Sequence, residues 1–204
     1  MAFGSKHKKS PSTTEPSRPQ PEGLRAGGPW DGTEREATPD YLDFTSLLVK
    51  GVPGLELQVA SDGHSHVAVL VGLHGSAVEL RAIAASKSGN DWDLLIDDVT
   101  AEIRERGAEP VVRQGVFGTE VLTQFPAKDP EGNDLVQPAC FMGVVGPRWL
   151  LRATIIGPAA LDLGQESALV AVVKDVIVRR GQEARLLGEP LPLTVPEQMQ
   201  ALET

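Results

Sequence analysis

The chain has 204 residues, a formal net charge of −9 and a hydrophobic fraction of 41%, values that suit one folded domain with tails and exclude wholesale disorder. Residues 1–28 carry five basic and two acidic side chains, a net +3, so the remainder carries −12. An acidic body repels phosphate backbones, and aromatic residues make up only 4% of the chain. Both values exclude nucleic acid as the main partner.

The distribution of apolar residues bears on the compartment. No apolar segment follows Lys6, Lys8 and Lys9, so the N-terminus is not a secretory signal. No run of about 18 apolar residues occurs, so we expect no transmembrane segment and a cytoplasmic protein. The basic tail would touch an anionic membrane surface only weakly. The lone cysteine, Cys140, lies in the apolar run PACFMGVV and is interpreted as a small buried hydrophobe.

Composition divides the chain into three parts. Residues 1–28 are rich in Pro, Ser, Gly and Lys, which predicts a disordered basic tail. Residues 29–186 form the predicted domain, within which residues 29–54 are expected to dock as an extended segment with a short helical turn around 42–48. Residues 187–204 are interrupted by prolines and predict an extended C-terminal tail, with Leu191, Leu193 and Val195 against the body.

Hydrophobic periodicity then predicts the elements in chain order. Three strands come first, over residues 55–60, 66–73 and 77–84, separated by turn-forming residues. Apolar residues at steps of three and four predict a helix beginning at Asn90 or Asp91 and ending before Gly107. Four strands follow at about 110–114, 118–125, 136–145 and 149–156, and a second helix is predicted at about 164–180.

The element order βββαββββα predicts an α+β fold. Hairpin-length connections favour a largely antiparallel sheet of six to seven strands. The two amphipathic helices can cover one face of this sheet or one face each.

A search for chemical motifs finds no catalytic residues and no cofactor site. His64, His66 and His74 lie around one predicted hairpin, but turn histidines are common and a metal site is not predicted. Neither a nucleophile elbow nor a partnered Cys/His motif occurs, and phosphate-binding and dinucleotide fingerprints are also missing.

Four residues form the candidate binding site. They are Trp30, Asp31, Arg148 and Arg152. Arg148 and Arg152 are placed on one face of the last strand, opposite Trp149. Two fixed guanidinium groups on an acidic body can bind a carboxylate or phosphate. The alternative is that they pair internally with Asp31 or Glu79.

Several separated motifs resemble an actinobacterial family of unknown function, DUF3710. They are GPWD at 28–31, LLVKGVPGLELQV at 47–59, GVFGTE at 115–120 and GPRWLLRATIIGPAAL at 146–161. The resemblance spans about residues 28–192, with Val116 in place of the usual proline, and it implies no activity. The element order also resembles Mog1/PsbP-like α/β/α sandwiches, which include partner-binding accessory proteins. A secretion-chaperone-like fold is the structural alternative.

Two functional hypotheses follow from these observations. The first is a non-enzymatic adaptor that binds another protein through the sheet face carrying Arg148 and Arg152 and through the Trp30 segment. The second is a small-molecule-binding domain or enzyme with a pocket between sheet and helices near the same arginines.

Overall fold

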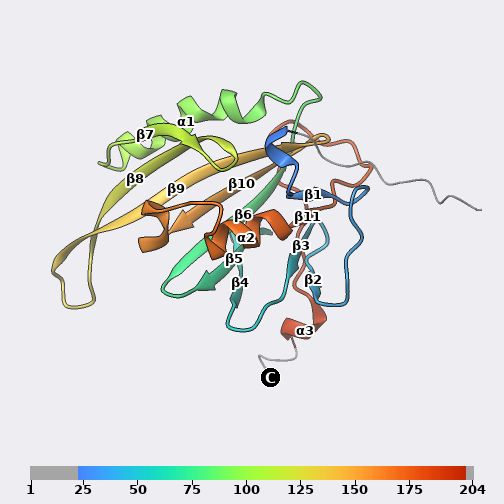
Figure 1. Ribbon diagram of the computed structural model, residues 1–204, viewed down its shortest axis with the longest axis horizontal. Coiled ribbons are helices and arrows are strands. Elements are labelled where there is room, and N and C mark those ends of the chain that lie inside the picture. The colour runs from blue at the N-terminus through green and yellow to red at the C-terminus, as the bar shows by residue number, and fades with distance from the viewer. Residues whose placement is uncertain (1–22, 201–204) are drawn as a thin grey trace, which may run out of the picture.

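The computed structural model describes residues 23–200, and the predictions for residues 1–22 and 201–204 lie outside this range. Its main element is a seven-stranded antiparallel sheet with the order β4-β5-β6-β10-β9-β8-β7 (Figure 1). The strands are β4 (Glu56–Ser61), β5 (His66–Leu73), β6 (Ser76–Ala84), β7 (Val111–Gly115), β8 (Gly118–Lys128), β9 (Asp134–Gly146) and β10 (Trp149–Ile156). The predicted α+β class and antiparallel sheet are confirmed.

A second sheet of four short strands lies beside the first and was not predicted. Its order is β1-β11-β3-β2, built from β1 (Trp30–Asp31), β2 (Tyr41–Asp43), β3 (Leu47–Lys50) and β11 (Ile177–Val178). The helical turn expected around 42–48 is therefore wrong. The spacing of Phe44, Leu47 and Leu48 fits one face of a helix. An unbroken apolar run also fits a strand that is buried on both faces, and β3 is such a strand.

The helices cover opposite faces of the seven-stranded sheet. α1 (Asp91–Glu105) packs against β8 and β9, with Trp92, Val99 and Ile103 in one hydrophobic cluster. α2 (Ala168–Asp175) contributes Leu169 and Val173 to the larger cluster on the other face, between the two sheets. None of the helices within residues 23–200 has the length and hydropathy to cross a bilayer.

The second helix is much shorter than predicted. It ends at Asp175, because Val176 turns to an extended conformation and Ile177 and Val178 pair with β1 and β3. Pairing in a buried sheet suits these β-branched side chains better than another helical turn.

Three short helical segments complete the fold. They are the 3₁₀ helices η1 (Gly23–Arg25) and η2 (Pro158–Leu161) and the short helix α3 (Glu197–Gln200). η1 falls within the stretch predicted as tail, so residues 23–28 have a described structure. In the C-terminal segment, Leu191 and Leu193 are buried. Leu193 forms isolated bridges with Thr45 and His66, and the Leu191 N–H donates to the Ala82 carbonyl at 2.9 Å.

Candidate ligand-binding site

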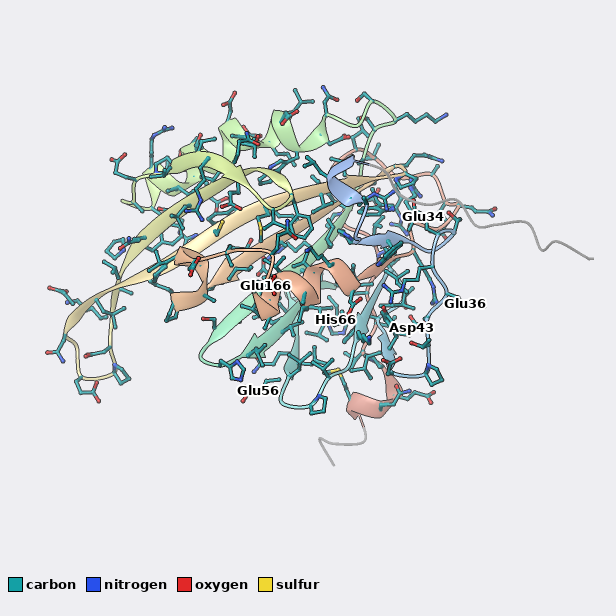
Figure 2. The ribbon with its side chains drawn as sticks, viewed as in Figure 1. Glu34, Glu36, Asp43, Glu56, His66 and Glu166 are labelled. Atoms are coloured by element: carbon teal, nitrogen blue, oxygen red, sulfur yellow. The ribbon has the colours of Figure 1, made fainter. Side chains whose placement is uncertain are left out.

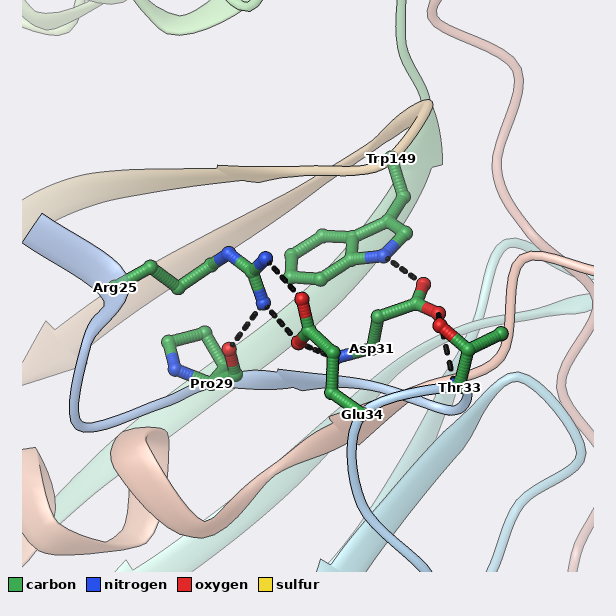
Figure 3. A network of polar contacts seen from close by, with 6 residues as sticks. All are labelled: Arg25, Pro29, Asp31, Thr33, Glu34 and Trp149. Carbon is green, nitrogen blue, oxygen red and sulfur yellow. Dashed lines mark hydrogen bonds and ion pairs between the residues drawn. The ribbon is translucent and has the colours of Figure 1, made fainter. Parts of the chain in front are cut away.

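Asp31 is a buried anchor of the N-terminal segment (Figure 3). Its Oδ2 accepts a hydrogen bond from Trp149 Nε1 at 2.8 Å, and its Oδ1 accepts from the backbone N–H and hydroxyl of Thr33 at 2.9 and 2.7 Å. Trp149 itself is fully buried at the start of β10. Asp31 therefore satisfies the indole N–H of the largest core side chain.

An ion pair between Arg25 and Glu34 closes this network around the same indole. Arg25 donates to both carboxylate oxygens of Glu34 at 2.6 Å, and Glu34 Oε2 also accepts from the Asp31 N–H at 2.7 Å. The Arg25 guanidinium lies 5.3 Å from the Trp149 ring centroid. Sequence analysis missed both Arg25 and Glu34, because a bidentate pair between the end of a short 3₁₀ helix and a turn leaves no periodic signal.

Trp30 lies in a small cluster on the second sheet. Its ring packs with Tyr41, Leu48 and Ile177, and the Arg35 guanidinium lies 5.0 Å from the ring centroid. Trp30 and Asp31 thus both attach the N-terminal segment to the rest of the domain.

Arg148 and Arg152 occupy different environments. Arg148 is exposed in the turn between β9 and β10, with φ of 64°, outside the strand in which it was predicted. Arg152 lies in the middle of β10. Successive side chains of a strand point to opposite faces, and Trp149, Leu151 and Ala153 face the larger core. Arg152 therefore faces the α1 side of the sheet, opposite the face that Asp31 contacts, and the four predicted residues do not form one site.

Arg152 instead lines a pocket of about 400 Å³ between the last turns of α1 and the sheet. Its walls come from β6, β8, β9, β10 and α1. The side chains that line it with Arg152 include Glu79, Arg81, Glu102, Arg106, Phe125, Phe141 and Thr154. A volume of this size is typical of small-ligand sites.

The two acids of the pocket already have basic partners. Glu79 accepts hydrogen bonds from Arg81 Nε at 2.7 Å and Nη2 at 3.1 Å, and this bond raises the pKa of Arg81. Glu102 lies 3.8 Å from Arg106, whose guanidinium stacks 3.9 Å from the Phe125 ring centroid. Three arginines against two glutamates leave this pocket with an excess positive charge, although the chain as a whole is acidic.

Arg152 supplies this excess positive charge, because Arg81 and Arg106 pair with the two glutamates. Within residues 23–200 it makes no hydrogen bond or ion pair, and its Nε is buried without a partner. Its guanidinium lies 5.4 Å from the centroid of the Phe141 ring. Its partner across the strands is Arg81, a like charge. Burial lowers the pKa of Arg152. The charge of Glu102, and more weakly that of Glu79, acts against this shift, whereas the charge of Arg81 adds to it.

A second unpartnered group lies on the same strand face. Thr154 is two residues beyond Arg152, and its buried hydroxyl has no hydrogen-bond partner. Buried polar groups are nearly always hydrogen-bonded, so adjacent exceptions need an explanation. An oxyanion in the pocket would accept hydrogen bonds from both Arg152 and Thr154.

The predicted internal pairing of Arg152 does not occur. Glu79 is bound by Arg81, and Asp31 is bound by Trp149 and Thr33. Sequence analysis identified Arg152 but missed Arg81, Arg106 and Thr154, because their convergence depends on strand register and on where α1 ends.

Other reactive residues of the described chain lie outside this pocket. Burial, reinforced by the charge of Glu120, raises the pKa of the Cys140 thiol from 9.0 to about 12, so it is not an activated nucleophile. His74 lies in the β5–β6 turn and His66 begins β5. Among residues 23–200, no group of three or more His, Cys, Asp or Glu side chains is placed to hold a metal ion.

Comparison with known proteins identifies a family. The model of a family described as "Protein of unknown function (DUF3710)" matches residues 28–202. The chain belongs to the DUF3710 family. No curated protein and no solved structure matches it. The DUF3710 assignment confirms the resemblance seen in the sequence motifs, whereas the likeness to Mog1/PsbP-like proteins gains no support.

Proposed function

We propose that this DUF3710 protein is a ligand-binding domain that holds an oxyanion in the pocket between α1 and the seven-stranded sheet. The observation that carries the proposal is the unpaired, partly buried guanidinium of Arg152 beside the unpaired hydroxyl of Thr154. A carboxylate or phosphate would accept a charge-assisted hydrogen bond from the Arg152 guanidinium and a second hydrogen bond from the Thr154 hydroxyl.

The walls of the pocket favour an anion attached to an apolar or planar group. Phe125 and Phe141 form an edge-to-face pair, with ring centroids 6.5 Å apart, and both are buried. These two rings supply the apolar part of a lining that is otherwise mostly polar and charged. Arg81 and Arg106 are already engaged by Glu79 and Glu102, so Arg152 is the primary anion contact.

Calorimetric titration and thermal unfolding with benzoate, glutarate, citrate and inorganic phosphate test this proposal. An anion present at about 100 times its dissociation constant should stabilise the fold by about 2.7 kcal/mol, or about 5–10 °C for a chain of this size. Arg152→Gln should abolish the effect. Arg104→Gln, which removes an exposed charge from the last turn of the same helix, should leave it unchanged. Binding that survives in Arg152→Gln would exclude this pocket.

The second candidate function is an adaptor that binds another protein. The polar sheet face that continues from the pocket across β6, β5 and β4 favours it, with Glu56 and Gln58 exposed there. Trp30 and Asp31 do not add to that surface, because Asp31 is buried and Trp30 packs against the second sheet.

A further inference from the structure

The pocket around Arg152 continues into a second hollow on the same face of the sheet. This hollow has a volume of about 360 Å³, lies over β4, β5 and β6, and shares Gln137 and Ile156 with the first. Glu56 and Gln58 of β4 line its far side. The two hollows therefore form one groove that runs obliquely over the strands, from α1 toward the β4 edge.

The ends of the groove carry opposite charges. Arg152 is the unpaired cation at one end, and Glu56 at the other makes no hydrogen bond or ion pair within residues 23–200. Figure 2 shows Glu56 on the lower edge of the molecule, away from α1. A ligand that matches both ends must carry an anion and a cation at a fixed separation.

Strand register gives that separation. Glu56 pairs with Gly72, Gly72 with Ala77 and Ala77 with Ile156, so Glu56 is level with a residue four positions beyond Arg152. Three strand spacings are about 14 Å and four residues along a strand are about 13 Å, which places the Cα atoms of Glu56 and Arg152 about 19 Å apart. An extended chain covers this distance in about five to six residues.

The lining between the two ends suits a polypeptide. The side-chain amides of Gln58 and Gln137 make no hydrogen bond within the described chain, and an amide both donates to and accepts from peptide groups. Leu70 and Ile156 supply an apolar floor between these amides, and the Glu56 side chain lies over Gly72 at the far end.

From these observations we propose that the groove binds the C-terminal segment of a partner protein. In this proposal the terminal carboxylate accepts hydrogen bonds from Arg152 and Thr154, and a lysine or arginine about five residues upstream forms an ion pair with Glu56. This inference rests on the proposed oxyanion site and adds the class of ligand. It also makes the adaptor hypothesis specific, because the partner is defined by a free carboxyl terminus and an upstream basic residue.

A pooled library of fluorescent hexapeptides tests the proposal at pH 8, where an ordinary histidine is neutral. One pool ends in a free carboxylate and a matched pool ends in an amide. The free-acid pool should be retained with lysine or arginine enriched at the first position. Peptides selected from it should lose about tenfold or more in affinity on amidation, because a charge-assisted hydrogen bond is lost. Equal retention of both pools, or retention of neither, would overturn the proposal.

Variants separate the two ends of the groove. Arg152→Gln should remove the preference for the free acid, and Glu56→Lys should change the first-position preference from basic to acidic. Glu131→Lys, an exposed glutamate in the β8–β9 turn, is the matched control and should change neither. An unchanged first-position preference in Glu56→Lys would contradict the placement of the chain.

Small anions separate this inference from the oxyanion site on which it rests. If benzoate or phosphate binds through Arg152 while no peptide pool is retained, the oxyanion site stands and the peptide inference is wrong. If neither small anions nor peptides bind in an Arg152-dependent way, both are wrong.

Discussion

Individual residues of this fold differ sharply in how well their polar groups are satisfied. Arg25, Asp31, Glu34 and Trp149 share a network in which each carboxylate accepts several hydrogen bonds. Arg152 has no such partner, although a partly buried charge without a counter-ion is costly. We interpret this contrast as evidence that Asp31 serves stability, whereas Arg152 serves binding.

The first prediction follows from the cost of the unpaired charge. Arg152→Met should keep the ligand-free protein folded and raise its free energy of unfolding by about 1 kcal/mol, because methionine packs on Phe141 without a buried charge. Urea denaturation of the wild-type and variant proteins measures this. A loss of 2 kcal/mol or more, on the scale of a broken buried interaction, would show instead that Arg152 is needed for the fold.

The second prediction concerns the anchor. Asp31→Ala should lower the free energy of unfolding by about 2–3 kcal/mol, because the buried Trp149 indole N–H loses its acceptor. Asp43→Ala, which removes an exposed carboxylate paired with Arg179, should cost about 1 kcal/mol or less. Equal effects in the two variants would argue against a special role for Asp31.

At the scale of elements, α1 is held on the sheet by a close approach at one glycine. Gly143 of β9 lies directly under the Trp92 ring, and an added Cβ would come within 2.2 Å of the ring. The Trp92 indole N–H also donates to the Thr119 carbonyl at 2.7 Å. The position of α1, and therefore the wall formed by Glu102 and Arg106, depends on this contact.

Gly143→Ala should therefore destabilise the protein by about 1–3 kcal/mol, because ring and backbone must shift apart. It should also weaken anion binding at Arg152 as α1 moves. Gly164→Ala is a suitable control, since an added Cβ there meets no atom within 4 Å. Denaturation midpoints of the two variants and titration with the best anion check both expectations, and equal midpoints would mean that the contact is unimportant.

Periodicity predicted the main sheet well because each strand carries its own signal. Strands β5 and β10 have the bounds expected from their alternating residues, and α1 lies close to its predicted range. The second sheet was missed, since β1 and β11 are two residues long and exist only through pairing with distant segments. The candidate site was predicted only at Arg152, because Arg81 and Thr154 reach it through register, which a single sequence does not specify.

At the scale of the whole molecule, a buried core separates the binding face from the anchored N-terminal segment. Cys140 lies in this core, on the face opposite Arg152, and is fully buried. Because its pKa is raised to about 12 in the folded protein, ionisation of this thiol near pH 9 to 10 reports unfolding of the whole domain.

The sign of the pH effect follows from the direction of that shift. Well below pH 9 the thiol is protonated in both states and contributes no pH dependence. Between pH 9 and about 12 the unfolded chain releases the proton while the folded chain retains it, so stability falls as pH rises. Between pH 8 and 10 the wild type should lose about 1.4 kcal/mol more than Cys140→Ala. Parallel losses in urea denaturation would show that the thiol is not shielded.

The central claim is that Arg152 is an oxyanion receptor. The most direct measurement is the NMR signal of its Nε–H, assigned by its absence in Arg152→Gln, during titration with benzoate and then with a selected free-acid hexapeptide. A saturable downfield shift of this signal, with the Arg104 signal unchanged, is the predicted result. An Arg152 signal that stays in place throughout both titrations would contradict the account.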